Sequence, residues 1–287
     1  MIFKGVCTAL VTPFNKNKTV DYVGLKNLID HQIKNNISAI LILGTTGESS
    51  TISYSEREEI IKFTKKQLPK ECKLIVGTGT NNLYTTIKYT KQAQSLGADA
   101  VLIVTPYYNK CTQNGIVKYY KKISKNTNIP YIVYNVPTRT GFNIRPATYK
   151  KLIKLNNMCG IKEANADITH VLEVLYLLKD KTAIYSGNDN LNYIFLCCGA
   201  KGTISVTSNI FPDLVQKSFN CVKSGKELMF KLHNLNNVLF IEPNPIPVKY
   251  ALSKLGIIKP YVRYPLTIAE LKTRKKIDKQ LTYLGEQ

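Results

Sequence analysis

A lysine, Lys162, directly follows the small apolar run Met158 to Ile161 in the stretch NMCGIKEANAD. A lone ammonium group beside such a run costs free energy unless it is paired, loses its proton or reacts chemically. The adjacent Glu163 is a poor partner, because consecutive residues of a strand point to opposite faces. A neutral lysine amine is a nucleophile that forms an imine with a carbonyl compound. The residue type and its surroundings therefore predict covalent catalysis through an imine at Lys162.

Hydroxyl side chains follow several other apolar runs of the chain. An imine withdraws electrons, so the adjacent carbon can lose a proton to give an enamine. A phenol can carry that proton if its own proton is relayed onward. We expect Tyr134, Tyr108 and Thr45 to form this relay.

Each of these residues also has a purely structural interpretation. Tyr108 and its neighbour Tyr107 are of a type common at protein interfaces, and Thr45 and Thr46 can cap a helix. The motif GTTGE lacks the lysine of a phosphate-binding P-loop, and GTGTNN at Gly77 lacks the third glycine of a dinucleotide fingerprint. Neither motif predicts a nucleotide site.

Short apolar runs alternate with longer amphipathic segments over most of the chain. The segments have apolar residues three and four positions apart, which is typical of helices. Eight such units are what a closed parallel barrel requires, so we expect an α/β fold, a (β/α)8 TIM barrel, whose chemistry lies where the strands end. The apolar runs cover residues 5–13, 38–44, 72–79, 98–106, 130–137, 158–164, 182–187 and 201–208.

The pattern changes after about Asn220, where long helical stretches follow without a further strand. We therefore expect a catalytic barrel over residues 1–224 and a small helical region over residues 225–287. No internal repeat or low-complexity linker separates the two.

The chain of 287 residues has a formal net charge of +21, which raises the question of nucleic acid, an acidic membrane surface or anionic substrates as partners. Its lysines are spread over the expected helix faces and never form a run of five, and no homeodomain, zinc-finger or RRM signature is present. This spread of the lysines favours their placement on solvated helix faces, so we expect no nucleic-acid partner. A basic nucleic-acid-binding protein on an aldolase scaffold stays open as an alternative.

The seven cysteines show no C-x-x-C spacing and the three histidines are scattered, so we expect neither a disulfide framework nor a metal site. No apolar run approaches the ~18 residues of a membrane span. Pro13 also interrupts the first apolar stretch. We expect a cytoplasmic protein with no membrane partner.

Six motifs together closely resemble the dihydrodipicolinate synthase family, also called the 4-hydroxy-tetrahydrodipicolinate synthases. In order they are GTTGES (44–49), VTPYYNK (104–110), YNVPTRTG (134–141), GIKEA (160–164), YSGND (185–189) and EPNPIPVK (242–249). The resemblance implies condensation of pyruvate with L-aspartate 4-semialdehyde to 4-hydroxy-tetrahydrodipicolinate, in diaminopimelate and lysine biosynthesis. It implies no cofactor, because pyruvate is held as a covalent imine at Lys162.

The resemblance also implies roles for individual residues. Tyr134, Thr45 and Tyr108 form the relay, with Tyr108 supplied by the neighbouring subunit. Arg139 binds the semialdehyde carboxylate, a task that suits the two-pronged guanidinium group. Thr45 and Thr46 hold the pyruvate carboxylate. Backbone contacts around the imine come from Gly187 and Ile204.

The wider superfamily includes N-acetylneuraminate lyase and sugar-acid aldolases, which share the lysine and the tyrosine. A pyruvate-dependent lyase of 2-keto sugar acids is therefore an alternative. Arg139 and the tyrosine pair in TPYYN resemble the synthase and leave less room for a polyol. Family members are commonly tetramers built from two tight dimers, so a homotetramer is favoured over a dimer.

In lysine-inhibited members of the family, L-lysine binds at the dimer interface. This chain aligns Tyr54, Arg57 and Thr85 where such relatives generally place two histidines and a glutamate. It thus lacks the carboxylate that would meet the ligand's ammonium group and carries an added positive charge. We expect inhibition by lysine to be weak or absent. The residues of that site with counterparts here are Ser49, Ser50, Asn81 and Tyr107.

Overall fold

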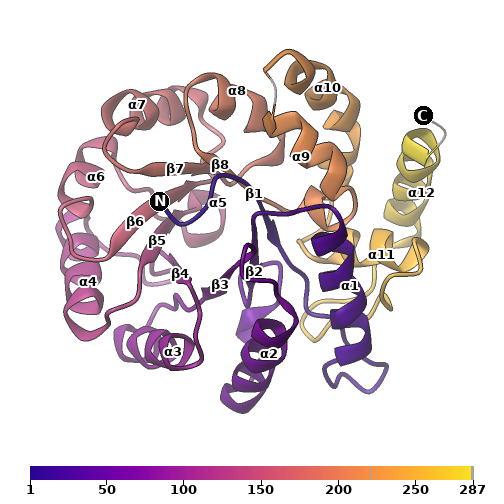
Figure 1. Cartoon of the computed structure of the whole chain (residues 1–287), viewed down its shortest axis with the longest axis horizontal. Coiled ribbons are helices and arrows are strands. Elements are labelled where there is room, and N and C mark those ends of the chain that lie inside the picture. The colour runs from indigo at the N-terminus through magenta and orange to yellow at the C-terminus, as the bar shows by residue number, and fades with distance from the viewer. Residues whose placement is uncertain (221, 286–287) are drawn as a thin grey trace.

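Eight parallel strands form a closed barrel in the computed structural model, which describes residues 1–220 and 222–285 (Figure 1). Each strand pairs with the next, and β8 returns to pair with β1. The predicted (β/α)8 barrel is confirmed. The strands are β1 Gly5–Ala9, β2 Ala39–Ile42, β3 Lys73–Gly77, β4 Ala100–Val104, β5 Tyr131–Asn135, β6 Met158–Glu163, β7 Ala183–Ser186 and β8 Gly202–Ser205.

Helices surround the barrel, and several begin at a polar side chain that accepts from a backbone N–H of the first turn. Ser53 and Glu56 form a reciprocal capping box at the start of α2. The short helix α5 Pro137–Thr140 lies over the C-terminal end of the barrel. Around the barrel lie α1 Tyr22–Lys34, α2 Tyr54–Gln67, α3 Leu83–Ser95, α4 Gln113–Asn126, α6 Pro146–Leu152, α7 Ile168–Leu178, α8 Asn192–Cys197 and α9 Pro212–Asn220. Short 3₁₀ turns are η1 Ser49–Thr51, η2 Asp189–Leu191 and η3 Thr207–Asn209.

Three further helices, α10 Val222–Val238, α11 Ile246–Lys254 and α12 Leu271–Gly285, follow the barrel. Figure 1 shows them together on one side of the barrel, and α10 packs against α8, α9 and α12. The C-terminal helices expected from the sequence are therefore present. The division between residues 224 and 225 stays a prediction.

The N-terminal end of the barrel is filled by aromatic side chains. The rings of Phe3 and Tyr185 stack with their centroids 4.3 Å apart, and the Tyr185 hydroxyl donates to the Phe3 carbonyl at 3.0 Å. Small and branched apolar residues such as Ala39, Leu41 and Ile75 fill the middle of the barrel. Polar groups that face the interior are consequently placed at the opposite, C-terminal end.

A buried ionic network ties the C-terminal region to the loop after β2. Lys249 Nζ lies 2.5 Å from Glu48 Oε1, and both side chains are buried. The backbone N–H of Arg263 donates to Glu48 Oε2 at 2.9 Å, while the Arg263 guanidinium binds Glu56 at the start of α2. This interaction holds the pKa of Glu56 at about 2. Glu48 itself has a left-handed φ of +53°, so the loop depends on these contacts to keep an unfavourable backbone conformation.

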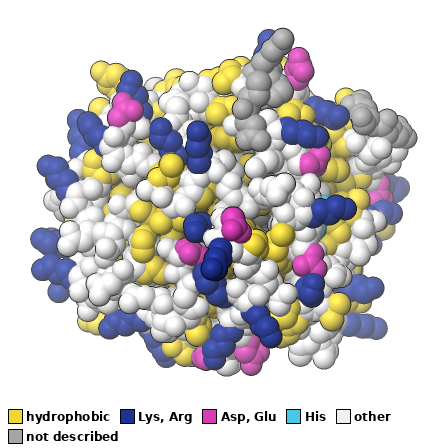
Figure 2. Space-filling view, viewed as in Figure 1, with side chains coloured by type: hydrophobic (Ala, Val, Ile, Leu, Met, Phe, Trp, Pro, Cys, Tyr) yellow, Lys and Arg dark blue, Asp and Glu magenta, His cyan; other side chains and the backbone are white. Residues whose placement is uncertain are grey.

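Lysine and arginine side chains are scattered over the face in Figure 2, with acidic side chains among them. The even spread agrees with the solvated helix faces expected from the sequence. In the described part of the chain, no helix has the length and hydropathy that a bilayer crossing requires.

We predict that Lys249→Met lowers the free energy of unfolding by about 3–5 kcal/mol, because it leaves the Glu48 carboxylate buried without a counter-charge. Urea denaturation followed by circular dichroism measures the change. Lys26→Met is the matched control, since the Lys26–Asp30 pair is half exposed and should contribute less than about 1 kcal/mol. Equal effects of the two substitutions would contradict the importance of the buried pair.

Candidate active site

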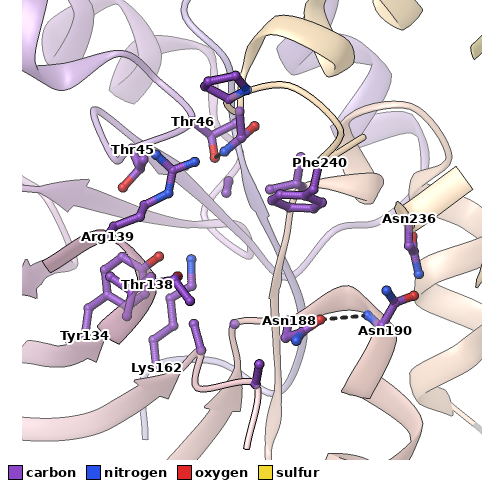
Figure 3. Close-up of a pocket in the computed structure, with 18 of the residues that line it drawn as sticks. Thr45, Thr46, Tyr134, Thr138, Arg139, Lys162, Asn188, Asn190, Asn236 and Phe240 are labelled. Atoms are coloured by element: carbon purple, nitrogen blue, oxygen red, sulfur yellow. Dashed lines mark hydrogen bonds between the residues drawn. The ribbon is translucent and has the colours of Figure 1, made fainter. Parts of the chain in front are cut away.

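A cavity of about 560 Å³ opens at the C-terminal end of the barrel (Figure 3). Lys162 on β6 and Tyr134 on β5 both line it, because the register of these strands places the two residues side by side. The Lys162 Nζ atom lies 4.4 Å from the centroid of the Tyr134 ring. Strand pairing thus brings together a candidate nucleophile and a candidate proton carrier.

Lys162 is only 6% exposed and forms no ion pair with any described residue. Burial lowers the pKa of Lys162 to about 8, against the opposing influence of Cys7 and Asp189. The carboxylate of Asp189 accepts instead from the backbone N–H groups of Val206 and Thr207, at 2.9 and 3.0 Å. A substantial fraction of Lys162 is therefore neutral near pH 8, which is the form that attacks a carbonyl.

Glu163 points out of the barrel, as the alternation along a strand predicts. Its carboxylate is fully buried between β6 and the surrounding helices. It accepts hydrogen bonds from Asn135 Nδ2, the Tyr149 hydroxyl and the Asn165 N–H at 3.0, 2.9 and 2.8 Å, and lies 3.3 Å from His170 Nε2. The expectation that Glu163 does not pair with Lys162 is confirmed.

Tyr134 keeps its proton at neutral pH. Burial raises the pKa of Tyr134 to about 12, although the charge of Arg139 and the nearby Thr45 hydroxyl act in the opposite direction. Thr45 follows β2 and lines the cavity. Figure 3 shows Thr45 and Arg139 on the same side of the cavity as Tyr134. A protonated phenol beside a hydroxyl can donate a proton and recover one from its neighbour.

Thr46 is buried beside Thr45, and its hydroxyl accepts from Asn244 Nδ2 at 2.9 Å. Asn244 comes from the segment between α10 and α11, nearly two hundred positions further along the chain. Its Oδ1 atom is buried and has no hydrogen-bond partner among the described residues, and the residue lines the cavity. Asn244 is therefore a candidate binding residue that lies within the motif EPNPIPVK but was not assigned a role from the sequence.

Position 187 requires glycine, because the backbone there lies close to the Lys162 side chain. A Cβ atom at this position would lie 3.0 Å from Lys162 Cε and 2.8 Å from the Ala164 methyl group. The Gly187 N–H donates to the Glu163 carbonyl at 2.8 Å, which fixes the turn after β7. Ile204 on β8 is buried inside the barrel and is not among the residues that line the cavity.

Arg139 lies on the short helix α5 and is exposed at the rim of the cavity. It forms no ion pair with a described residue, so its guanidinium is available to an incoming anion. A rim guanidinium and a buried neutral lysine suit a substrate that carries both a carboxylate and a carbonyl group.

The structure does not bring Tyr108 to Lys162 within this chain. Its side chain is 87% exposed, its backbone has a left-handed φ of +73°, and it does not line the cavity. Ser49, Ser50 and Tyr107 line a second, adjacent cavity, whereas Asn81 is exposed and is absent from that lining.

The wall opposite Thr45 and Arg139 in Figure 3 is formed by amide side chains and Phe240, none of which the sequence analysis assigned. Asn190 Nδ2 donates to Asn237 Oδ1 at 2.8 Å, which joins η2 to α10. The sequence pattern did not point to these residues, because α10 lies outside the alternation of strands and helices that predicts the barrel. The amide residues of this wall are Asn188, Asn190, Asn236 and Asn237.

Groupings of three or more His, Cys, Asp or Glu side chains suited to a metal ion are not found in the part of the chain that the structure describes.

A model of the Dihydrodipicolinate synthetase family matches residues 2–284. The chain belongs to this family. The 4-hydroxy-tetrahydrodipicolinate synthase of Alkaliphilus oremlandii is 43% identical over 281 residues, which cover 96% of this chain and 97% of the relative. The family assignment made from six sequence motifs is therefore confirmed.

Solved structures of the family share the fold closely. A dihydrodipicolinate synthase from Thermotoga maritima superposes with a TM-score of 0.97 at 40% identity and covers 99% of each chain. A structure described as a monomeric dihydrodipicolinate synthase variant has a TM-score of 0.96 at 41% identity, covering 99% of this chain and 97% of that one. The agreement extends over the barrel and the C-terminal helices.

We predict that borohydride traps a three-carbon adduct of pyruvate on Lys162, seen as a mass increase of the intact protein, and that Lys162→Ala abolishes it. Because the neutral amine reacts, the trapping rate should rise with pH and level off above about 8, the lowered pKa of this lysine. A rate that keeps rising toward the ordinary lysine value of about 10.4 would contradict the depressed pKa. Lys26→Ala serves as the control.

Proposed function

We propose that this chain is a lyase that condenses pyruvate with L-aspartate 4-semialdehyde to give 4-hydroxy-tetrahydrodipicolinate, as a cytoplasmic enzyme of diaminopimelate and lysine biosynthesis. The observation that carries the proposal is the buried Lys162, which pairs with no carboxylate in the described part of the chain and lies beside the Tyr134 phenol. Relatives named 4-hydroxy-tetrahydrodipicolinate synthase support it over nearly the whole chain. No metal or other cofactor takes part.

The reaction begins at the amine of Lys162. It attacks the ketone carbon of pyruvate, and loss of water gives an imine. The methyl carbon then loses a proton, and the resulting enamine forms a carbon–carbon bond with the aldehyde carbon of the semialdehyde, whose oxygen becomes a hydroxyl group. Attack of the substrate's amino group on the imine carbon closes the ring and releases Lys162. One water is lost for each pair of substrates joined.

Proton transfer in these steps falls to hydroxyl groups. Tyr134 donates to the departing water and takes up the methyl proton, and Thr45 passes protons between Tyr134 and Tyr108 of a neighbouring subunit. The high pKa of Tyr134 suits a group that ends each cycle protonated. Thr45 is the central member, because its hydroxyl lines the cavity on the same side as the Tyr134 phenol.

Two carboxylates need separate binding groups. The pyruvate carboxylate lies against the hydroxyls and backbone N–H groups of Thr45 and Thr46, with the backbone of Gly187 and Ile204 around the imine. Arg139 clamps the carboxylate of the semialdehyde at the rim. Asn244 donates to the Thr46 hydroxyl and keeps that hydroxyl oriented toward the pyruvate carboxylate.

The active form is a homo-oligomer, with a tetramer of two tight dimers favoured over a dimer. The exposed ring of Tyr108 supports this, because its role in the relay requires a second subunit to bring it to Lys162. One similar solved structure is described as a monomeric variant, so the assembly needs a direct test.

We predict that Arg139→Ala lowers kcat/KM for L-aspartate 4-semialdehyde roughly ten- to hundredfold, because one charge-assisted carboxylate contact is lost. Borohydride trapping of pyruvate should be unchanged, since imine formation precedes acceptor binding. Arg145→Ala, at an exposed arginine outside the cavity, is the control. Equal loss of trapping and condensation would make Arg139 structural.

The same assay decides the acceptor class. Pyruvate consumption is measured with the semialdehyde, then with N-acetylmannosamine and with glyceraldehyde. We expect turnover with the semialdehyde alone. Faster turnover with either sugar-derived aldehyde would favour the sugar-acid lyase alternative.

Subunit complementation tests the shared relay. We predict that Tyr108→Phe and Lys162→Ala each remove most activity, and that co-expression restores roughly a quarter of it. In a mixed dimer, the intact Lys162 of one subunit meets the intact Tyr108 of the other. No recovery in mixed dimers isolated with two different tags would show that Tyr108 does not act across subunits.

A further inference from the structure

Asn135 and Glu163 directly follow Tyr134 and Lys162 on β5 and β6, and the strand register pairs these two residues with each other. Because side chains alternate along a strand, Tyr134 and Lys162 face the cavity, whereas Asn135 and Glu163 face the surrounding helices. Asn135 Nδ2 donates to both oxygens of the Glu163 carboxylate, at 3.0 and 3.2 Å, and both side chains are fully buried. This outer pair therefore ties the two strands together at the level of the active-site pair, Tyr134 and Lys162.

The ladder between β5 and β6 is irregular near its other end. Its register shifts by one residue between Tyr131 and Ile132. A shift of one residue turns every later side chain of a strand to the opposite face relative to its partners. The contact between Asn135 and Glu163 forms at the last paired position of the ladder. It thus holds the register beyond the irregularity, and this register sets the active-site pair side by side.

The Asn135 side chain also closes the loop that follows β5. Its Nδ2 atom donates to Asn143 Oδ1 at 2.8 Å, and its Oδ1 atom accepts from the Ile144 N–H at 3.1 Å. Helix α5, which carries Arg139, lies within this loop. Both hydrogens and the oxygen of one buried amide are therefore in use, and they join β5, β6 and the segment that carries the rim arginine.

Glu163 places a carboxylate where packing alone would favour an apolar side chain, because a buried charge is costly unless hydrogen bonds compensate it. The groups around it come from β5, α6, α7 and the turn after β6. Hydrogen bonds to an ionised acceptor are shorter and stronger than neutral ones, so the carboxylate holds its partners firmly. Burial is the main reason for the raised pKa of Tyr134, and the negative charge of Glu163 raises that pKa further. Both effects keep the phenol protonated.

We propose that Asn135 and Glu163 are positioning residues, which hold the Tyr134 phenol in line with Lys162 and keep the Arg139 loop at the rim of the cavity. The inference rests on the proposed function, because it concerns the proton transfer of that reaction. Neither residue of the outer pair lines the cavity, so both act through their neighbours. Misplacement of a reacting group by about 1 Å can slow a reaction roughly a hundredfold.

The test is exchange of the pyruvate methyl hydrogens in heavy water, followed by proton NMR without an acceptor substrate. Enamine formation releases a methyl proton to the Tyr134 phenol, and a deuteron returns to the carbon. We expect Asn135→Ala to slow this exchange roughly ten- to hundredfold. In a Tyr134→Phe background, the same substitution should slow the residual exchange by less than about threefold, because a residue that acts through the phenol has no effect once the phenol is gone.

Tyr120→Phe is the matched control. The Tyr120 hydroxyl is equally buried and donates to the Ile103 carbonyl of β4 at 2.8 Å, away from the outer pair. Both Tyr120→Phe and Asn135→Ala should lower the melting temperature, whereas Asn135→Ala alone should slow exchange. If Asn135→Ala does not fold, Glu163→Gln replaces it. This variant keeps the shape of the side chain and should slow exchange at least about threefold, because charge-assisted contacts become neutral ones.

Two results would overturn the positioning role while leaving the proposed function intact. One is unchanged exchange in the folded variant of the outer pair. The other is equal slowing by Asn135→Ala with and without the Tyr134 hydroxyl, which would indicate a general loss of structure. A wild-type protein that neither forms the borohydride adduct nor exchanges the methyl hydrogens would instead overturn the proposed function, and the positioning role with it.

Discussion

The function depends on one constraint, which is the alternation of side chains along β6. Lys162 and Glu163 are adjacent in the chain, yet one enters the barrel and the other is buried outside it. Four surrounding groups on the outer side, from Asn135, Tyr149, Asn165 and His170, contact the carboxylate and keep it from the lysine. If both side chains shared a face, the ammonium group would be paired, its pKa would rise, and the neutral amine needed for imine formation would be scarce.

The C-terminal region acts on the site through the loop after β2. Asn244 holds the Thr46 hydroxyl, and the buried Lys249–Glu48 pair fixes the loop that also carries Thr45. Burying this ion pair costs desolvation free energy. In return the pair fixes the loop, which presents the hydroxyls of Thr45 and Thr46 in defined directions. The helices after the barrel therefore help to position side chains of the active site and also stabilise the fold.

Three arginines show how the same group serves different purposes. Arg263 is saturated by protein acceptors and holds the C-terminal segment to α2. Arg139 is exposed at the rim of the active site, where solvent hydrates it until a ligand arrives. Arg57 is buried with most of its donors unused. Its lack of a carboxylate partner among the described residues distinguishes it from Arg263.

The sequence by itself determined the barrel, because strand and helix periodicities are local, and it determined the family, because six motifs remain in order along the chain. It also predicted the isolation of Lys162 from Glu163, since alternation is a property of any strand. Only the tertiary structure decided that Asn244 reaches Thr46, that amides of η2 and α10 form a wall of the site, and that Arg57 is buried with no carboxylate partner among the described residues. These contacts join residues far apart in the chain, and their distances arise from packing, which no local pattern encodes.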